Sequence, residues 1–198
     1  MSLFAITRRY VPAALLLVAL TTAAVGGCAY LDRNLRVVKP GEFYRSAQMP
    51  PHMLGEAIRT KGIRSVINLR GRHPEEEWYR EESAVCQAHS VAHYDLAWSM
   101  KRLPPPESLA AFVELVETAE RPILVHCQGG THRTGVASAV FLLLEGADLK
   151  DAREQFGPFF GDAPIGNLLD LYEGSDMPFG EWSREVYPSV YESAAAAG

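Results

Sequence analysis

The segment from residue 126 to residue 135 constrains this chain of 198 residues most strongly, and it reads His-Cys-Gln-Gly-Gly-Thr-His-Arg-Thr-Gly. An apolar run, Pro122 to Val125, precedes it, and a helical pattern, Thr134 to Leu144, follows it. A strand that turns directly into a helix leaves backbone N–H groups without intrahelical partners. In a glycine-rich turn these groups converge and bind an anion. The sequence therefore predicts a strand, a loop that grips a tetrahedral oxyanion such as phosphate, and a helix.

Three side chains give this loop its predicted chemistry. Cys127 lies near the positive end of the following helix, and that field lowers the pKa of a thiol and favours the thiolate. Arg133 closes the loop from the helix side, where its planar guanidinium can hold two phosphate oxygens at once. The Thr134 hydroxyl can point back at the sulfur and stabilise it as nucleophile and as leaving group.

These residues predict catalysis in two steps. Cys127 attacks phosphorus to form a cysteinyl-phosphate, and water then hydrolyses this intermediate. Backbone N–H groups and Arg133 hold the equatorial oxygens, so the stabilisation is mainly electrostatic. The scheme needs neither a metal ion nor another cofactor. The residues predicted to bind the substrate phosphate follow the cysteine directly: Gln128, Gly129, Gly130, Thr131, His132 and Arg133.

The string H-C-x-x-G-x-x-R-T-G resembles the phosphate-binding loop of the cysteine-dependent protein phosphatases, above all the small dual-specificity type and its bacterial relatives. Its ending, from His132 to Gly135, resembles an atypical branch that includes inositol pyrophosphate phosphatases. Phe43 to Gln48 and Gly62 to Arg70 resemble two further stretches of that group, and the likeness extends from Leu35 to Tyr172. The resemblance implies a phosphatase acting on phosphotyrosine or mixed phosphoprotein substrates, and it implies that Arg45 is a structural brace.

Other interpretations of the loop stay open at this point. Cys127 would be inert if the glycines only formed a turn around a buried structural cysteine. A sulfur-transfer domain also places a cysteine between a strand and a helix. A phosphatase-like module that captures phosphorylated partners without turnover would need the same loop and the same Arg133. Phosphoinositides or inositol (pyro)phosphates are alternative substrates, although the loop carries no lysine for a highly charged ring.

The general acid is less clear than the nucleophile. The resemblance implies an aspartate on a loop after an earlier strand, and Asp95 has a family-like separation from Cys127. Asp95 nevertheless falls at the end of a predicted strand, while the loop after it contains no carboxylate. A structural partner at a strand end is therefore an equal interpretation of Asp95. Glu107 and Asp162 are lesser candidates.

The remaining pattern alternates strands with helices, which indicates an α/β fold with a mainly parallel central sheet flanked by helices. The resemblance implies the cysteine-phosphatase fold of the dual-specificity type. We expect a β-hairpin over 35–46 and strands over 65–69, 92–96 and 122–126. The helices expected from turn and capping signals cover residues 50–61, 74–89, 104–120, 134–145, 149–156, 166–173 and 180–191.

The first residues resemble an export signal rather than part of the fold. Two arginines precede a short apolar stretch, and the segment ends in Val25-Gly26-Gly27-Cys28, which resembles a bacterial lipoprotein cleavage box. This predicts a signal peptide over 1–27, a lipid on Cys28, a linker over 28–34, a phosphatase domain over 35–192 and a disordered tail over 193–198. An uncleaved anchor helix is the alternative. The expected location is the periplasmic face of the bacterial cell envelope, anchored to a membrane.

Charge and cysteine content complete the prediction. The net charge is −5, and removal of residues 1–27, which hold two arginines and no acid, leaves 17 basic against 24 acidic residues, or −7. A chain this acidic does not favour nucleic acid as a partner. Besides Cys28 there are two cysteines, Cys86 and Cys127. Cys86 is expected as an inert core residue, with a reversible disulfide to Cys127 as the alternative.

Overall fold

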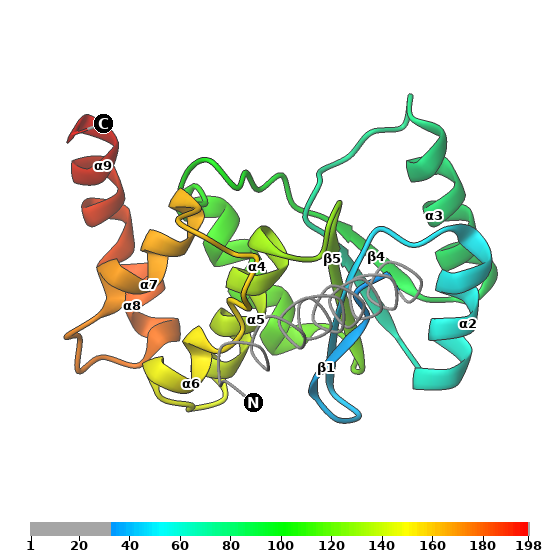
Figure 1. Ribbon diagram of the computed structural model, residues 1–198, viewed down its shortest axis with the longest axis horizontal. Helices are drawn as coiled ribbons and strands as arrows, with labels where there is room; N and C mark the ends of the chain where they lie inside the picture. Colours follow the sequence, from blue (N-terminus) through cyan, green and yellow to red (C-terminus); the bar gives the residue numbers. More distant parts are fainter. Residues whose placement is uncertain (1–32, 198) are drawn as a thin grey trace, which may run out of the picture.

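A computed structural model describes residues 33–197, and it contains one five-stranded sheet in the order β1-β2-β5-β3-β4 (Figure 1). β2, β5, β3 and β4 run parallel to one another, and β1 joins β2 antiparallel at the edge. The mainly parallel sheet and the N-terminal hairpin are thus confirmed. The strands are β1 (Arg36–Lys39), β2 (Phe43–Ala47), β3 (Ser65–Asn68), β4 (Ala92–Asp95) and β5 (Ile123–Cys127).

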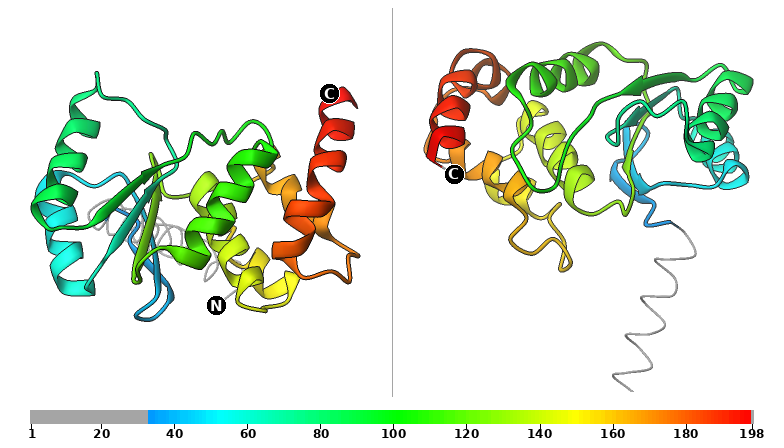
Figure 2. Two further views of the ribbon diagram at one scale, coloured as in Figure 1. Left: turned by 180° about the vertical axis from the view of Figure 1, so that it is seen from behind. Right: turned by 90° about the horizontal axis from the view of Figure 1, so that it is seen from above.

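Helices cover both faces of the sheet, as the alternating pattern predicts. α2 (Pro51–Lys61) and α3 (Glu77–Ala88) lie on one side, and the later helices lie on the other (Figures 1 and 2). That second layer comprises α4 (Pro106–Thr118), α5 (His132–Leu144), α6 (Leu149–Arg153), η1 (Pro164–Gly166), α7 (Asn167–Tyr172), α8 (Phe179–Glu185) and α9 (Tyr187–Ala197). The α/β class with its flanked central sheet is therefore confirmed.

β5 is the middle strand, and it separates two hydrophobic cores. Its residues are buried on both faces, as expected for a central parallel strand. Ile123, Val125 and Cys127 belong to the larger core beneath α4 and α5, whereas Leu124 belongs to the smaller core beneath α2 and α3. This alternation aims Cys127 at the layer that contains α5, at the carboxyl end of the sheet, where parallel α/β folds bind their ligands.

The predicted helix boundaries differ from the observed ones at the C-terminal end. The helix expected over 180–191 is two helices, which meet at Val186. Pro188 explains the break, because it has no N–H to donate to the carbonyl of Arg184. The helix expected over 149–156 ends at Arg153, and the one expected over 166–173 begins as a 3₁₀ turn. α9 also includes residues 193–197, where the sequence predicts a disordered tail.

The predicted signal peptide, the lipidated Cys28 and most of the predicted linker lie outside the residues that the structure describes. Over 33–197, no helix combines the length and the apolar character needed to cross a bilayer.

Candidate active site

Cys127 ends β5, and its sulfur lies under the first turn of α5. The thiol is 3% exposed, and the Thr134 hydroxyl donates to Sγ over 2.9 Å. Burial by itself raises the pKa of the Cys127 thiol. The hydrogen bond from Thr134, the charge of Arg133 and backbone N–H groups of Thr134 and Gly130 outweigh burial, so the pKa lies below its ordinary value. The local structure therefore favours a thiolate, as the sequence predicts for a nucleophile.

The loop after Cys127 is held from outside by its carbonyl groups. Asn34 donates to the carbonyl oxygens of Gly129 and Gly130 over 3.2 and 2.9 Å. The Arg45 guanidinium donates to those of Gly130 and Thr131 over 3.0 and 3.2 Å. Because a peptide N–H points opposite to its carbonyl, these bonds turn the N–H groups of the loop toward the space above the sulfur. The predicted brace role of Arg45 is confirmed by these contacts.

Gly130 is the glycine that the loop geometry requires. Its φ is +66°, and a Cβ built there would lie 2.5 Å from the backbone N of Ala47. A side chain at this position would push the loop away from β2. A Cβ at Gly129 would meet nothing within 4 Å, so that residue is not under the same constraint.

Arg133 lies in the first turn of α5, and one of its terminal nitrogens is already oriented by the fold. Nη1 donates to the carbonyl oxygens of Leu69 and Trp98 over 3.2 and 3.4 Å. These two bonds tie the guanidinium to the residue after β3 and to the loop after β4, and they leave Nη2 and Nε for a ligand. His132 begins the helix, where its ring packs against Phe160 at 5.5 Å between centroids.

The sequence leaves two roles open for Asp95, that of the general acid and that of a structural partner at a strand end. It is the last residue of β4, and Asn68 donates to its Oδ1 over 2.8 Å while the Tyr79 hydroxyl donates to its Oδ2. Both carboxylate oxygens are thus engaged by neighbouring elements, which favours the structural interpretation. Glu107 lies in the first turn of α4, and Asp162 lines a separate small cavity beside α7.

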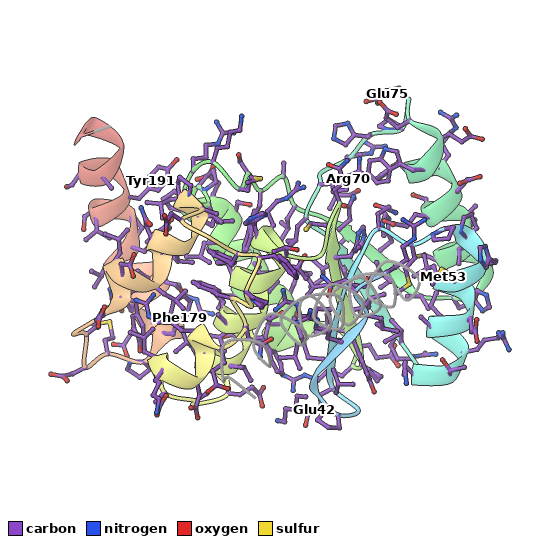
Figure 3. All side chains as sticks on the ribbon, in the orientation of Figure 1. Glu42, Met53, Arg70, Glu75, Phe179 and Tyr191 are labelled. Atoms are coloured by element: carbon purple, nitrogen blue, oxygen red, sulfur yellow. The ribbon has the colours of Figure 1, made fainter. Side chains whose placement is uncertain are left out.

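A second arginine, Arg70, was not predicted as a site residue. It follows β3 (Figure 3). Its guanidinium stacks on the Trp78 ring at 3.6 Å, and its Nη1 donates to Oε1 of Gln48 over 3.2 Å. Burial and the nearby positive charge of Arg133 lower the pKa of Arg70, and the charges of Glu82 and then Cys127 oppose that effect. Arg70 therefore lies within electrostatic range of both catalytic candidates. The sequence feature that could have identified Arg70 as a site residue is its position at the end of the G-I-R-S-V-I-N-L-R stretch.

A buried carboxylate joins Arg70 to the residue before the nucleophile. Glu82 on α3 is 3% exposed. Its Oε1 lies within hydrogen-bond distance of His126 Nε2, at 3.0 Å, and of His93 Nε2, at 2.9 Å. Its Oε2 receives the side-chain amide of Gln48. Burial raises the pKa of Glu82, but the charges and hydrogen bonds of His126 and His93 prevail and lower it to about 2. Sequence spacing gave no sign of this network.

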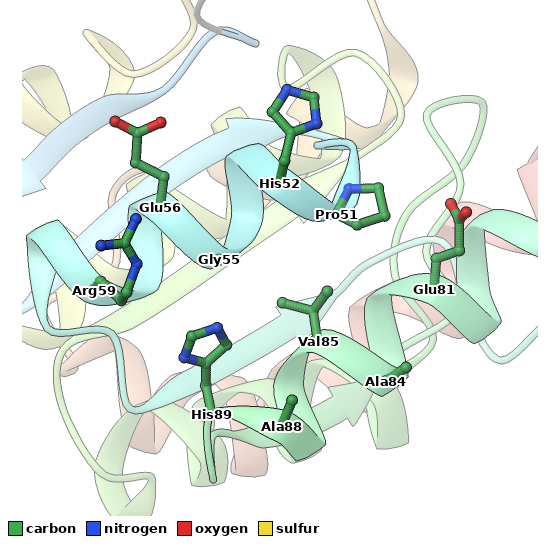
Figure 4. Close-up of a pocket in the computed structure, with 10 residues that line it drawn as sticks. All are labelled: Pro51, His52, Gly55, Glu56, Arg59, Glu81, Ala84, Val85, Ala88 and His89. Carbon is green, nitrogen blue, oxygen red and sulfur yellow. The ribbon is translucent and has the colours of Figure 1, made fainter.

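Another cavity lies away from this site. It measures about 600 Å³ and opens between α2 and α3, with His52, Glu56 and Arg59 on one wall and His89 on the other (Figure 4). It contains neither a cysteine nor a residue of the phosphate loop. Within 33–197, no three His, Cys, Asp or Glu side chains are arranged to hold a metal ion.

Comparison with known proteins agrees with this geometry. A model of the tyrosine phosphatase family matches residues 24–156. OCA1 of Mycosarcoma maydis, which carries the name of a tyrosine-protein phosphatase, is 31% identical over 122 residues, which cover 60% of this chain and 75% of that protein. Receptor-type tyrosine-protein phosphatase V of Rattus norvegicus is 31% identical over 107 residues, 48% of this chain but only 6% of that much longer protein.

Solved structures show the same fold. TpbA of P. aeruginosa superposes with a TM-score of 0.56 at 22% identity, covering 79% of this chain and 91% of that one. The core catalytic domain of the PP-IP phosphatase SIW14 from S. cerevisiae, in complex with citrate, gives 0.54 at 22% identity, covering 83% and 91%. Together with the family match over most of its length, this places the chain in the tyrosine phosphatase family.

Proposed function

We propose that this protein is a cysteine-dependent phosphatase of the dual-specificity-like branch that hydrolyses phosphomonoesters with phenolic leaving groups, phosphotyrosine above all. The observation that carries the proposal is the environment of the Cys127 sulfur. It accepts a hydrogen bond from Thr134 beneath a loop whose carbonyl groups are turned outward. An inert cysteine in a turn would need neither feature.

The reaction follows from this arrangement. The Cys127 thiolate attacks phosphorus, the P–O bond to the phenol breaks, and the phenolate leaves. The loop N–H groups and Arg133 hold the three equatorial oxygens as charge redistributes. Water then attacks the cysteinyl-phosphate, phosphate departs, and the Thr134 hydroxyl stabilises the sulfur as it becomes a thiolate again.

Phenolic substrates suit this site because no free carboxylate lies on the loop after β4. That loop, residues 96–105, contains Lys101 and Arg102 but neither Asp nor Glu. A phenolate leaves with little help from an acid, whereas an alkoxide needs a proton. A structure of a cysteine-to-serine variant of TpbA in complex with pTyr supports this substrate class by likeness.

An inositol pyrophosphate is the second candidate substrate, because its leaving group is a phosphate and also needs no acid. The likeness to SIW14 and the closeness of Arg70 to Arg133 favour it. The loop side chains Gln128 and Thr131 stand where a lysine would serve a highly charged ring, and they favour the simpler ester.

The deciding experiment compares leaving groups on the purified full chain under reducing conditions. We expect aryl phosphates and phosphotyrosine peptides to turn over at least about 100-fold faster than alkyl phosphates. General acid catalysis contributes about 10²–10⁴-fold where it is present, and the alkyl esters would lack this contribution here. Cys127→Ser should abolish all turnover. Phosphatidylinositol phosphates and inositol pyrophosphates in the same panel test the alternative. A protein that binds phosphopeptides but hydrolyses none of these esters would be a capture module instead.

The same panel assigns Asp95. With both oxygens engaged by Asn68 and Tyr79, Asp95→Asn should lower turnover of aryl and alkyl phosphates by the same factor. A loss confined to the alkyl ester would make Asp95 the general acid after all.

We infer further that the enzyme acts at the membrane of a bacterial cell envelope, tethered by a lipid on Cys28. The support is the sequence alone: paired arginines, a short apolar stretch and the small residues before Cys28. In a bacterial host, labelled palmitate should be incorporated into the native chain and not into Cys28→Ala. Equal labelling of both chains, or of neither, would reject the anchor while leaving the phosphatase proposal intact.

A further inference from the structure

A second cavity lies behind the phosphate loop, on the side that its carbonyl groups face. It measures about 240 Å³, and three segments distant in sequence form its walls: the first hairpin, the loop itself and the turn after α6. Its described lining residues are Asn34, Arg36, Arg45, Gly129, Gly130, Thr131, Gln155, Gly157, Pro158 and Phe159. None of them is acidic, and two are arginines.

Arg45 has one donor left over in this wall. A guanidinium carries five N–H donors. Nη1 donates to the backbone and side-chain oxygens of Gln155 over 2.7 and 3.2 Å, and Nη2 donates to Gly130 and Thr131. These bonds account for four donors, while Nε is buried without a partner in a side chain that is only 4% exposed. A buried donor of this kind calls for a water or an ion.

Arg36 supplies the second positive charge. It lies opposite Arg45 in the β1–β2 register, and its guanidinium approaches the turn at Gly157. Among residues 33–197, no carboxylate forms an ion pair with either arginine. Burial lowers the pKa of Arg45 to about 10, and the charge of Arg36 acts in the same direction.

The carbonyl oxygens in the wall do not cancel this charge. Those of Gly129, Gly130 and Thr131 already accept hydrogen bonds from Asn34 or Arg45. What the cavity offers to a ligand is therefore the positive charge of two guanidinium groups and an apolar lip. The lip consists of Pro158 and Phe159, and Phe159 is 79% exposed.

We propose that this rear cavity binds an anion, a phosphate or carboxylate group attached to an apolar moiety, between Arg36 and Arg45. The anion pairs with Arg36 and lies beside the Arg45 guanidinium, while its apolar part covers Phe159. Two sources share this chemistry: a soluble phosphorylated or carboxylated metabolite, and the headgroup of an anionic lipid. Bound there, the anion neutralises the arginine that holds the phosphate loop and stabilises the loop from behind.

The test counts phosphate sites on the full chain, with inorganic phosphate as the probe and calorimetry as the readout. Arg133→Met removes the phosphate site above Cys127, which we call the front site. We expect this variant to retain one bound phosphate in the rear cavity. Adding Arg36→Glu to it should weaken that binding at least tenfold. Arg59→Glu is the matched control, because it makes the same charge change at an exposed position on α2 and should leave binding within twofold.

Arg36→Glu alone provides a second measurement if the Arg133 variant folds poorly. It should reduce the phosphate stoichiometry of the otherwise native chain from two to one and leave the basal hydrolysis of an aryl phosphate unchanged. Loss of all phosphate with Arg133→Met, or binding that ignores Arg36, would overturn the rear site. Neither result measures hydrolysis, so the proposed phosphatase activity is tested separately, by the substrate panel.

Vesicles separate the two sources. Phosphatidylglycerol vesicles that bind the native chain more tightly than Arg36→Glu, in competition with phosphate, identify a lipid headgroup as the ligand. Phosphate binding that depends on Arg36, with vesicle binding that does not, identifies a soluble anion. Phosphatidylcholine vesicles serve as the uncharged control for either result.

Discussion

At the scale of single residues, the site depends on one hydroxyl group and on one glycine. The Thr134 hydroxyl offsets the burial of the Cys127 sulfur, and Gly130 lets the loop approach β2. Both lie within the segment 126–135, so both could be predicted from the sequence. Arg45 and Asn34 act on the same loop from about 90 positions away, and only the resemblance pointed to Arg45.

Replacing the hydroxyl tests its share in catalysis. Thr134→Val keeps the shape of the side chain and removes the donor, so the pKa of Cys127 should rise. A hydrogen bond to a charged group contributes about 1.5–3 kcal/mol, which corresponds to roughly 10–100-fold in kcat. The pH profile of iodoacetamide alkylation should move to higher pH. An unchanged profile would show that Thr134 does not act on the sulfur.

The two glycines of the loop form a matched pair. Gly130→Ala places a Cβ against β2 at positive φ and should cost about 2 kcal/mol or more of unfolding free energy, with loss of phosphatase activity. Gly129→Ala should leave both within a small margin, because its Cβ meets open space. Urea unfolding and turnover of an aryl phosphate measure the difference. Equal effects would contradict the observed approach of the loop to β2.

At the scale of elements, α3 is tied to the catalytic strand by a charge rather than by apolar packing alone. Glu82 connects α3 to β4 through His93 and to β5 through His126, next to the nucleophile. These partners are scattered along the chain, and each looks ordinary in its own segment. The helix that carries Glu82 was predictable from its acidic start, but its buried carboxylate was not, because glutamate is usually exposed.

Glu82 should make stability depend on acid in a defined window. Its folded pKa of about 2 lies below the ordinary value of 4.5, so its contribution is complete above about pH 4.5 and is lost as pH falls toward 2. Glu82→Gln should cost about 1–3 kcal/mol at neutral pH, because it removes the buried carboxylate that His126 and His93 both contact.

Urea unfolding at several pH values measures this effect as the difference between native protein and variant. That difference should shrink between about pH 4.5 and pH 2. Glu81→Gln, the exposed neighbour on α3, should show neither the loss nor the pH dependence. A Glu82 variant as stable as native protein would remove the tie between α3 and the catalytic strand.

At the scale of the whole molecule, the sheet divides the two cysteines. Cys86 belongs to the core under α2 and α3, and Cys127 faces the core under α5. Burial raises the pKa of Cys86 to about 12, so it stays a thiol where Cys127 ionises. The inert interpretation of Cys86 follows from this arrangement. The order of the layers was predictable from alternating strands and helices, whereas the core that each cysteine joins depends on strand register.

Oxidation provides the test. Treatment of the native chain with peroxide should modify Cys127 and leave Cys86 unmodified, and peptide mapping without reduction should find no Cys86–Cys127 link. Phosphate should slow the oxidation of Cys127 by occupying the site. Recovery of the linked peptide would revive the disulfide switch and require the layers to open.

The hydrogen bonds from Asn34 and Arg45 to the carbonyl groups of the phosphate loop limit how the active site could be transplanted. Asn34 and Gly130 are 96 positions apart, yet the first hairpin is as much a part of the catalytic centre as the segment that names the family. Grafting residues 126–135 alone onto a foreign strand and helix would transfer the nucleophile without its support. A portable unit of this chemistry therefore needs at least two pieces of chain, from opposite halves of the protein.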